Sequence, residues 1–203
     1  MITADDRTAI TAALGAAEER TSGQIVCVLA QSSSDYSYVP LLWAAFLALA
    51  CPWPLIIFTQ LSVQRIYLLQ IASFIVAALV LAWYPFRMML VPRAIRRAQA
   101  HRAAMEQFFT RGVTRTRDRT GILIFVSLAE HYARIVADEG IASRVKDSEW
   151  QAAVDELTSH MRNGRVAQGL VAAIERCGSV LAEHAPPSGA GHELPEHLYV
   201  VSF

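Results

Sequence analysis

The chain has 203 residues, of which 54% are hydrophobic and 18% are charged, and its formal net charge at pH 7 is zero. This length suits one soluble domain with an insertion rather than two full domains, and the apolar excess is unusual for an ordinary soluble domain. The zero net charge points to neither an acidic nor a basic class of partner.

The first thirty residues predict a helix followed by a buried strand. Thr3 and Asp6 have the spacing of a capping box, and apolar residues recur at helical spacing up to Arg20. Residues 24–30 are apolar at both odd and even positions, which face opposite sides of a strand, and they are rich in β-branched side chains. This pattern is typical of a central strand covered on two faces. No apolar core marks the first twenty residues as a signal peptide. Residues 32–35 are interpreted as a polar spacer, although such loops after parallel strands also bind ligands.

Residues 36–92 predict a transmembrane hairpin inserted after this strand. Arg65 is the one charged residue between Tyr36 and Phe86. Each half is long enough to cross a bilayer, since about 20 helical residues span a core of about 30 Å. We expect crossings near residues 39–58 and 66–83, with Pro52 and Pro54 disturbing the first. A buried helical hairpin is the alternative, but the rest of the chain is too small to enclose it.

The arginines predict the orientation of this hairpin. Nine arginines and two acids lie between Arg87 and Arg119, whereas the turn between the crossings holds only Arg65. The positive-inside rule then places the protein in the inner (cytoplasmic) membrane as a multi-pass protein with both termini in the cytoplasm. The lipid bilayer is the expected partner, because anionic headgroups favour the same basic segment. We expect no nucleic-acid partner, because the arginines are not interleaved with exposed aromatics.

Residues 93–184 predict the remainder of an α/β domain. A basic helix over 93–112 leads to strands at 122–128 and 132–137, which the short turn at 129–131 makes an antiparallel pair. Helices follow at 147–163, capped by Asp147 or Ser148, and at 166–184. Residues 185–203 are expected to form an irregular tail, in which the apolar residues 198–201 have no assigned place. The predicted fold is therefore a small mixed-sheet α/β sandwich of residues 1–35 and 93–184, with the hairpin as an insertion.

Three segments resemble the TPM domain family. They are residues 19–26 and 120–127, which lead into the first two strands, and residues 135–141, which leave the third; Trp150, Gly164 and Gly169 agree as well. The resemblance is to bacterial membrane-attached members that carry a hairpin inside the domain, and it implies a small α/β sandwich. Functions in the family range from assembly or repair of membrane complexes to phosphatase activity. Gln24 stands where the family often has Glu, which removes an acidic ligand.

The candidate metal ligands are Asp138, Glu139 and Asp147, whose carboxylates suit calcium or magnesium. Asp138 ends the third strand, which returns beside the second and so reaches Gly121. The alternative is a solvated turn, or an Asp138 that accepts backbone N–H groups. The sequence carries no phosphate loop, no GxGxxG and no GxSxG. The histidines His101, His131 and His160 are not spaced as metal ligands or as members of a catalytic triad. The cysteines Cys27, Cys51 and Cys177 form no metal-binding pattern and are interpreted as buried apolar fillers.

Two functions fit these observations. The favoured hypothesis is a membrane-anchored, non-enzymatic adaptor or assembly and quality-control factor that binds a membrane-protein partner. The alternative hypothesis is a metal-dependent phosphatase centred on Asp138, which depends mainly on the resemblance.

Overall fold

The computed structural model describes residues 3–34, 38–83, 90–116, 118–187 and 198–201. It divides the chain into two compact units. The α/β unit is Met1–Ser33 with Arg97–Phe203, and the hairpin unit is Ser34–Arg96. Asp35, Tyr36, Phe86, Arg87 and residues 188–197 of the expected tail lie outside the described residues.

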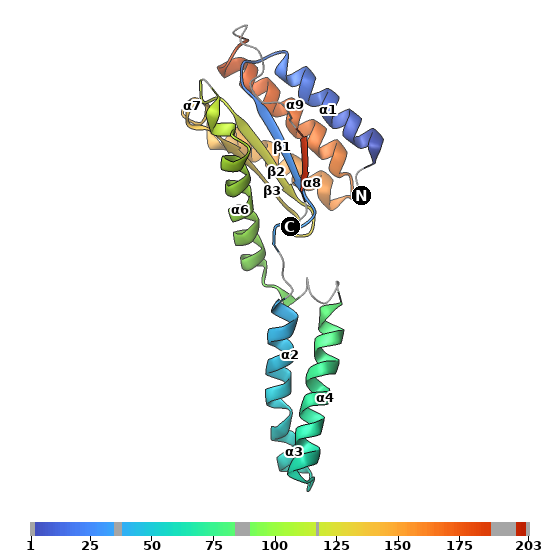
Figure 1. Cartoon of the computed structure of the whole chain (residues 1–203). Coiled ribbons are helices and arrows are strands. Elements are labelled where there is room, and N and C mark those ends of the chain that lie inside the picture. The colour runs from blue at the N-terminus through green and yellow to red at the C-terminus, as the bar shows by residue number, and fades with distance from the viewer. Residues whose placement is uncertain (1–2, 35–37, 84–89, 117, 188–197, 202–203) are drawn as a thin grey trace. The chain divides into compact units, whose positions relative to one another are not determined.

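A four-stranded mixed sheet with the order β3-β2-β1-β4 forms the centre of the α/β unit (Figure 1). β1 (Ile25–Ala30) pairs in parallel with β2 (Ile122–Ser127), and β2 pairs antiparallel with β3 (Tyr132–Ala137). The antiparallel pairing of β2 with β3 confirms the prediction, as does the mixed α/β fold class. The turn before β3 includes His131, whose φ of 48° lies in the left-handed region.

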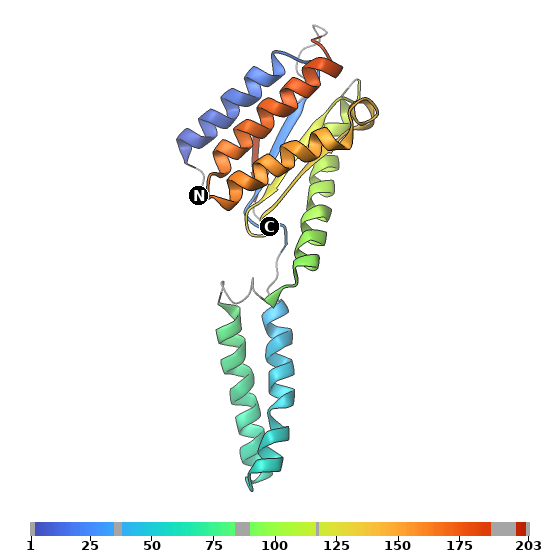
Figure 2. The same cartoon turned by 180° about the vertical axis from the view of Figure 1, so that it is seen from behind.

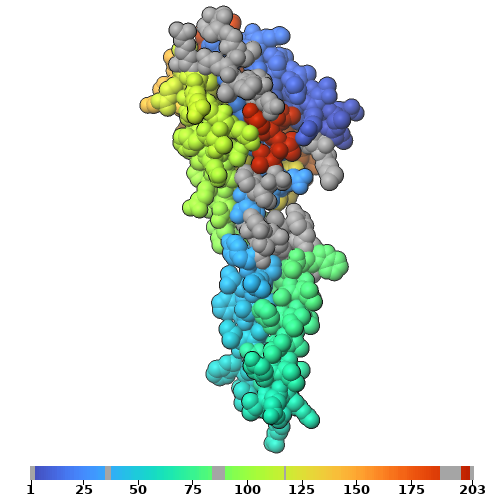
Figure 3. All heavy atoms as spheres, in the orientation of Figure 1, coloured from blue at the N-terminus to red at the C-terminus, as the bar shows by residue number. Residues whose placement is uncertain are grey.

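The fourth strand corrects the prediction of an irregular tail. β4 (Leu198–Val201) pairs in parallel with β1, with Cys27 opposite Leu198. The ring of Tyr199 lies under the guanidinium of Arg111, 3.8 Å from its centroid, a favourable cation–π geometry. Figure 3 shows β4, in red, beside the yellow-green atoms of α6 (Arg93–Thr110). Four apolar residues are too few for their periodicity to identify a strand, and the partner strand lies near the other end of the chain.

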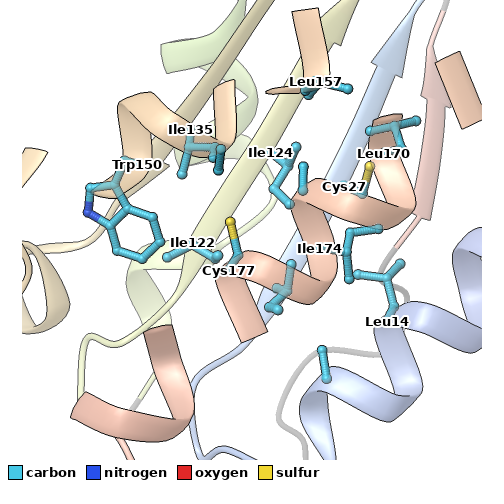
Figure 4. Close-up of a cluster of buried hydrophobic side chains, with 14 of the residues drawn as sticks. Leu14, Cys27, Ile122, Ile124, Ile135, Trp150, Leu157, Leu170, Ile174 and Cys177 are labelled. Atoms are coloured by element: carbon cyan, nitrogen blue, oxygen red, sulfur yellow. The ribbon is translucent and has the colours of Figure 1, made fainter. Parts of the chain in front are cut away.

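Helices cover both faces of the central strands, which explains why β1 and β2 are buried along their whole length. On one face, Ile25, Cys27 and Leu29 pack against a cluster that includes residues of three helices. These helices are α1 (Ala4–Glu18), α8 (Asp147–Arg162) and α9 (Val166–His184), seen in front of the sheet in Figure 2. The opposite face packs against Phe108 of α6. Figure 4 shows Leu14, Ile174 and Cys177 from α1 and α9 in the first cluster.

The helix ends follow the local sequence in most places. The Thr3 hydroxyl accepts from the Asp6 N–H at 3.2 Å, and the Asp6 carboxylate accepts from the Thr3 N–H at 2.9 Å, so the predicted capping box is confirmed. Asp147 does not cap α8: it is the first helical residue, and Lys146 occupies the cap position without a side-chain hydrogen bond. Two short helices were not predicted, a 3-10 turn at Val113–Arg115 and α7 at Glu139–Ala142.

Two apolar helical segments make up most of the hairpin unit. The first consists of α2 (Tyr38–Ala50) and α3 (Pro52–Phe58), and the second is α4 (Val63–Ala82). The first helix is interrupted at Cys51, as expected, because the proline after it has no N–H to donate. Ala44 and Ala48 are the buried non-proline residues of α2, and small side chains of this kind let two helices approach closely.

Candidate functional site

Asp138, the strongest candidate from the sequence analysis, lies at the end of β3 and is buried. Its N–H donates to the carbonyl of Gly121 at 2.9 Å, which confirms the predicted proximity of the two residues. Its Oδ1 accepts from the Glu139 N–H at 2.8 Å, so that Asp138 is the N-cap of α7. The observed role is therefore the one expected of a carboxylate that satisfies backbone donors at a helix start.

Arg119 completes the environment of Asp138. Its Nη2 lies 3.0 Å from Asp138 Oδ1, and its Nη1 pairs with the Glu139 carboxylate. The hydrogen bond to Asp138, reinforced by the attraction between the two charges, raises the pKa of the guanidinium. The backbone of Arg119 has φ of 52°, a left-handed conformation that bulky residues rarely adopt. One cation thus binds both carboxylates of the acidic turn, which consists of Asp138 and Glu139 at the end of β3.

The three predicted metal ligands are not gathered into one site. Asp138 and Glu139 share Arg119, while Asp147 begins α8. Within the described ranges, no group of three or more His, Cys, Asp or Glu side chains is placed to hold a metal ion. Arg119 already supplies the positive charge that the neighbouring carboxylates of Asp138 and Glu139 require. Calcium or magnesium binding at this turn stays a prediction.

The side chain of Gln24 is an unsatisfied polar group at the same end of the strands as Asp138. Its carbonyl accepts from the Ile122 N–H at 2.8 Å, but its buried side-chain Oε1 has no hydrogen-bond partner in the described structure. Thr21 and Thr120 are also buried here. The Thr21 hydroxyl donates to the carbonyl of Ala185 at 2.6 Å. The Oε1 of Gln24 is therefore a free amide acceptor at this end of the sheet, a group that can bind a donor or, weakly, a cation.

Glu130 is a buried carboxylate that was not predicted from the sequence. Ser33 donates to it through its N–H at 3.0 Å and through its hydroxyl at 3.3 Å, and Ser127 donates through its hydroxyl. These contacts tie the loop after β1 to the turn between β2 and β3. The spacing of Ser127 and Glu130, together with a serine-rich loop after a parallel strand, was the available signal. The interpretation of residues 32–35 as a mere spacer is therefore incomplete.

The other titratable candidates do not form a catalytic group. Burial raises the pKa of the Cys27 and Cys177 thiols to about 12, so both are inert fillers, as predicted. Cys51 is half-buried in the hairpin unit. His160 has a buried Nδ1 without a hydrogen-bond partner, and His101 and His131 are exposed.

The hairpin unit presents an apolar surface. Its two segments, Tyr38–Phe58 and Val63–Ala82, have a mean hydropathy of 2.1 each and are long and apolar enough to cross a membrane. Only 11% of the apolar stretch in the first segment is buried, and none of that in the second. Large exposed side chains such as Phe46, Trp53 and Leu79 cover it. Soluble monomers rarely expose so large a contiguous apolar patch.

Comparison with known proteins supports the fold and the resemblance. The model of the TPM domain family matches residues 84–180, which confirms the predicted resemblance over that range. Among solved structures, the NMR structure of the BA42 protein from the psychrophilic bacterium Bizionia argentinensis is similar, with a TM-score of 0.62 and 21% sequence identity. The alignment covers 99% of this chain and 96% of BA42, and it supports the α/β fold. No curated protein matches the chain.

Proposed function

Since residues 84–180 match the TPM domain family, we propose that this protein is a membrane-anchored, non-enzymatic adaptor, or an assembly and quality-control factor, for membrane proteins. The observation that carries the proposal is the exposed apolar surface of the hairpin unit, with side chains such as Phe46, Ile57 and Leu79 facing outward. Water disfavours this surface by roughly 25 cal/mol per Å², whereas lipid tails accommodate it. The hairpin is the anchor, and the α/β unit is the part that meets a partner.

The arginines of the chain support an orientation with the α/β unit in the cytoplasm. Arg93, Arg96, Arg97 and Arg102 lie in α6, close in sequence to the end of α4, whereas Arg65 is the one basic residue near the turn of the hairpin. Positively charged segments are retained on the cytoplasmic side of the membrane. Both termini are then cytoplasmic, and the turn at residues 59–62 lies outside.

An adaptor agrees with the state of two buried carboxylates, those of Asp138 and Glu130. Asp138 is bound by Arg119 and by a backbone N–H, and Glu130 is bound by two serines. Groups held in this way stabilise turns and are poorly placed to exchange protons with a substrate. What the α/β unit offers instead is a sheet covered by helices on both faces, a rigid frame for a binding surface.

The orientation is tested with introduced cysteines in a Cys51→Ser background. Thr59→Cys places a thiol in the exposed turn, and Ser159→Cys places one on the exposed side of α8. In intact cells, a membrane-impermeant maleimide is expected to label the first variant, and to label the second only after permeabilisation. The reverse pattern, or release of the protein from membranes without detergent, refutes the anchor.

The adaptor role is tested by cross-linking in intact cells followed by purification in mild detergent. The expected result is a reproducible membrane protein captured by the full chain. Recovery of the chain alone, with cross-linking efficiency verified on a known complex of the same membrane, contradicts the role.

A metal-dependent phosphatase is the second candidate. Gln24 in place of an acidic ligand weakens it, and the observation in its favour is that the buried Oε1 of Gln24, at the same end of the sheet as Asp138, has no hydrogen-bond partner in the described structure. A cation there would take oxygen ligands from these two residues once Arg119 moved away. The full chain is assayed in detergent on p-nitrophenyl phosphate with magnesium or calcium, beside Asp138→Asn. Equal rates in the two proteins eliminate this candidate.

A further inference from the structure

β3 has an unpaired edge. It lies at one end of the sheet and pairs only with β2 in the part of the chain that the structure describes. Because the Asp138 N–H points to Gly121 on the β2 side, alternation along the strand directs the N–H and C=O groups of Ala133, Ile135 and Ala137 outward. No backbone group of another described element bonds to these three residues. An open row of donors and acceptors is the template on which extended peptides add a strand.

A groove runs along this edge, with α8 as its wall. One cavity of 500 Å³ is lined by all of β3 together with Asp147, Trp150 and Val154. A second cavity of 300 Å³ shares Tyr132, Ala133 and Val154 with the first and extends to Arg97 and Arg162. Both volumes fall in the range of about 300–1,000 Å³ that ligand sites occupy. The groove therefore has room for an extended segment alongside β3.

The side chains that line the groove favour an acidic occupant. Arg97, Arg134 and Arg162 lie along it, and none has an ion pair within the described residues. The acids in the lining are Asp147 and Asp155, and Asp155 already accepts a hydrogen bond from the Gln151 amide at 2.8 Å. Unpaired guanidinium groups bind carboxylates by charge-assisted hydrogen bonds.

Trp150 forms part of the same wall. The residue is 7% exposed, and its indole Nε1 has no hydrogen-bond partner in the described structure. Figure 4 shows this nitrogen on the side of the ring that faces away from Ile122 and Cys177. The nitrogen is itself closed to solvent, so the contribution of Trp150 to the groove is the apolar body of its ring.

We propose that an extended, acidic segment of a partner protein docks along β3 and adds a strand to the sheet. The proposal deepens the adaptor function and rests on it. A second copy of this chain is a poorer occupant: pairing of β3 with β3 would bring Arg134, Arg97 and Arg162 of both copies to one interface, and like charges disfavour that association.

The test uses the full chain in detergent micelles and a short fluorescent peptide in which valines alternate with glutamates. Fluorescence anisotropy is expected to show saturable binding, with much weaker binding of the matched peptide that has lysine in place of glutamate. Arg134→Glu and Ala133→Pro should each raise the dissociation constant about tenfold or more, as for a residue at the centre of an interface. Proline is tolerated where an edge N–H faces outward, and it blocks docking at that position.

Arg7→Glu, an exposed charge reversal on α1, is the matched control and should bind the acidic peptide like the wild type. Unchanged thermal unfolding of Arg134→Glu keeps the result interpretable if Ala133→Pro folds poorly. Absence of binding, equal binding to all variants, or equal binding of both peptides overturns the proposal. So does a dimer whose particle mass halves in Ala133→Pro, since a second copy then occupies the edge.

The failure of the adaptor function gives a different result. If the cross-linked partner is captured equally by the wild type and by Arg134→Glu, the adaptor function is supported and the docking site along β3 is refuted. If no partner is captured while the acidic peptide binds at β3, the adaptor falls and the edge remains a peptide site.

Discussion

Gly140 should be the least replaceable small residue of the acidic turn. It lies in α7, two residues after Asp138, and a Cβ built on it would lie 2.3 Å from the Asp118 carbonyl oxygen and 2.7 Å from that of Arg119. Ordinary contacts begin near 3.4 Å, and both obstacles are backbone atoms that cannot rotate away. Gly140→Ala therefore has to move α7 or the 118–119 segment, and it disturbs the 3.0 Å pair between Arg119 and Asp138.

The expected cost follows from these distances. Forcing an extra methyl group into a packed site costs about 1–3 kcal/mol. The helix propensity of alanine returns at most about 1 kcal/mol, and less in a helix of a single turn. A net loss of about 1–2 kcal/mol should lower the melting temperature of a unit of this size by about 3–10 °C.

Gly15→Ala is the matched control, because Gly15 lies inside α1 and a Cβ there would meet no atom within 4 Å beyond the backbone of its own helix. The same substitution should there raise the melting temperature, by about 3–5 °C for a gain of about 1 kcal/mol. The assay is thermal unfolding of the full chain in detergent, followed by far-UV circular dichroism. A Gly140→Ala protein that melts at or above the wild-type temperature would refute the steric argument.

Three further outcomes are expected. Asp138→Ala should destabilise the α/β unit by about 1–2 kcal/mol, because α7 loses its N-cap and Arg119 loses its buried partner; denaturant titration measures it, and an unchanged midpoint contradicts the assignment. Burial raises the pKa of the Cys27 and Cys177 thiols to about 12, so alkylation at neutral pH should modify them only on unfolding, and rapid native-state labelling would contradict their burial. The hydrogen bonds from Thr3 lower the pKa of Asp6, so its stabilising contribution is full above the unfolded pKa of about 3.9 and is lost as the pH falls through the lower folded value. Asp6→Asn should accordingly reduce the drop in melting temperature on acidification, and an identical acid profile would show that the box contributes nothing.

The strands β1, β2 and β3 could be predicted because each is marked by a pattern of neighbouring residues. β1 and β2 are apolar on both parities, which requires cover on both faces, and a turn of four residues allows only an antiparallel β3. The capping box at Thr3 and Asp6 was predictable for the same reason, since its hydrogen bonds span three residues.

The candidate site was predicted only in part. Asp138 was recognised from its place at a strand end, but nothing in the local pattern indicated that Arg119 would bind it. Glu130 was missed because its partners include Ser33, which lies 97 positions away. The pairing of β4 with β1 and the open groove along β3 were beyond the sequence for the same reason.

The sequence by itself determined where apolar surface must be hidden: two uncharged helical stretches, two strands buried on both faces and the caps between them. Only the tertiary structure decided which carboxylates are neutralised and which edge is left open. Hydrophobic periodicity is a property of neighbouring residues, so it can be read along the chain. Ion pairs such as that of Arg119 with Asp138, and the free edge of β3, depend on which distant segments meet, and that is settled only when the whole core packs.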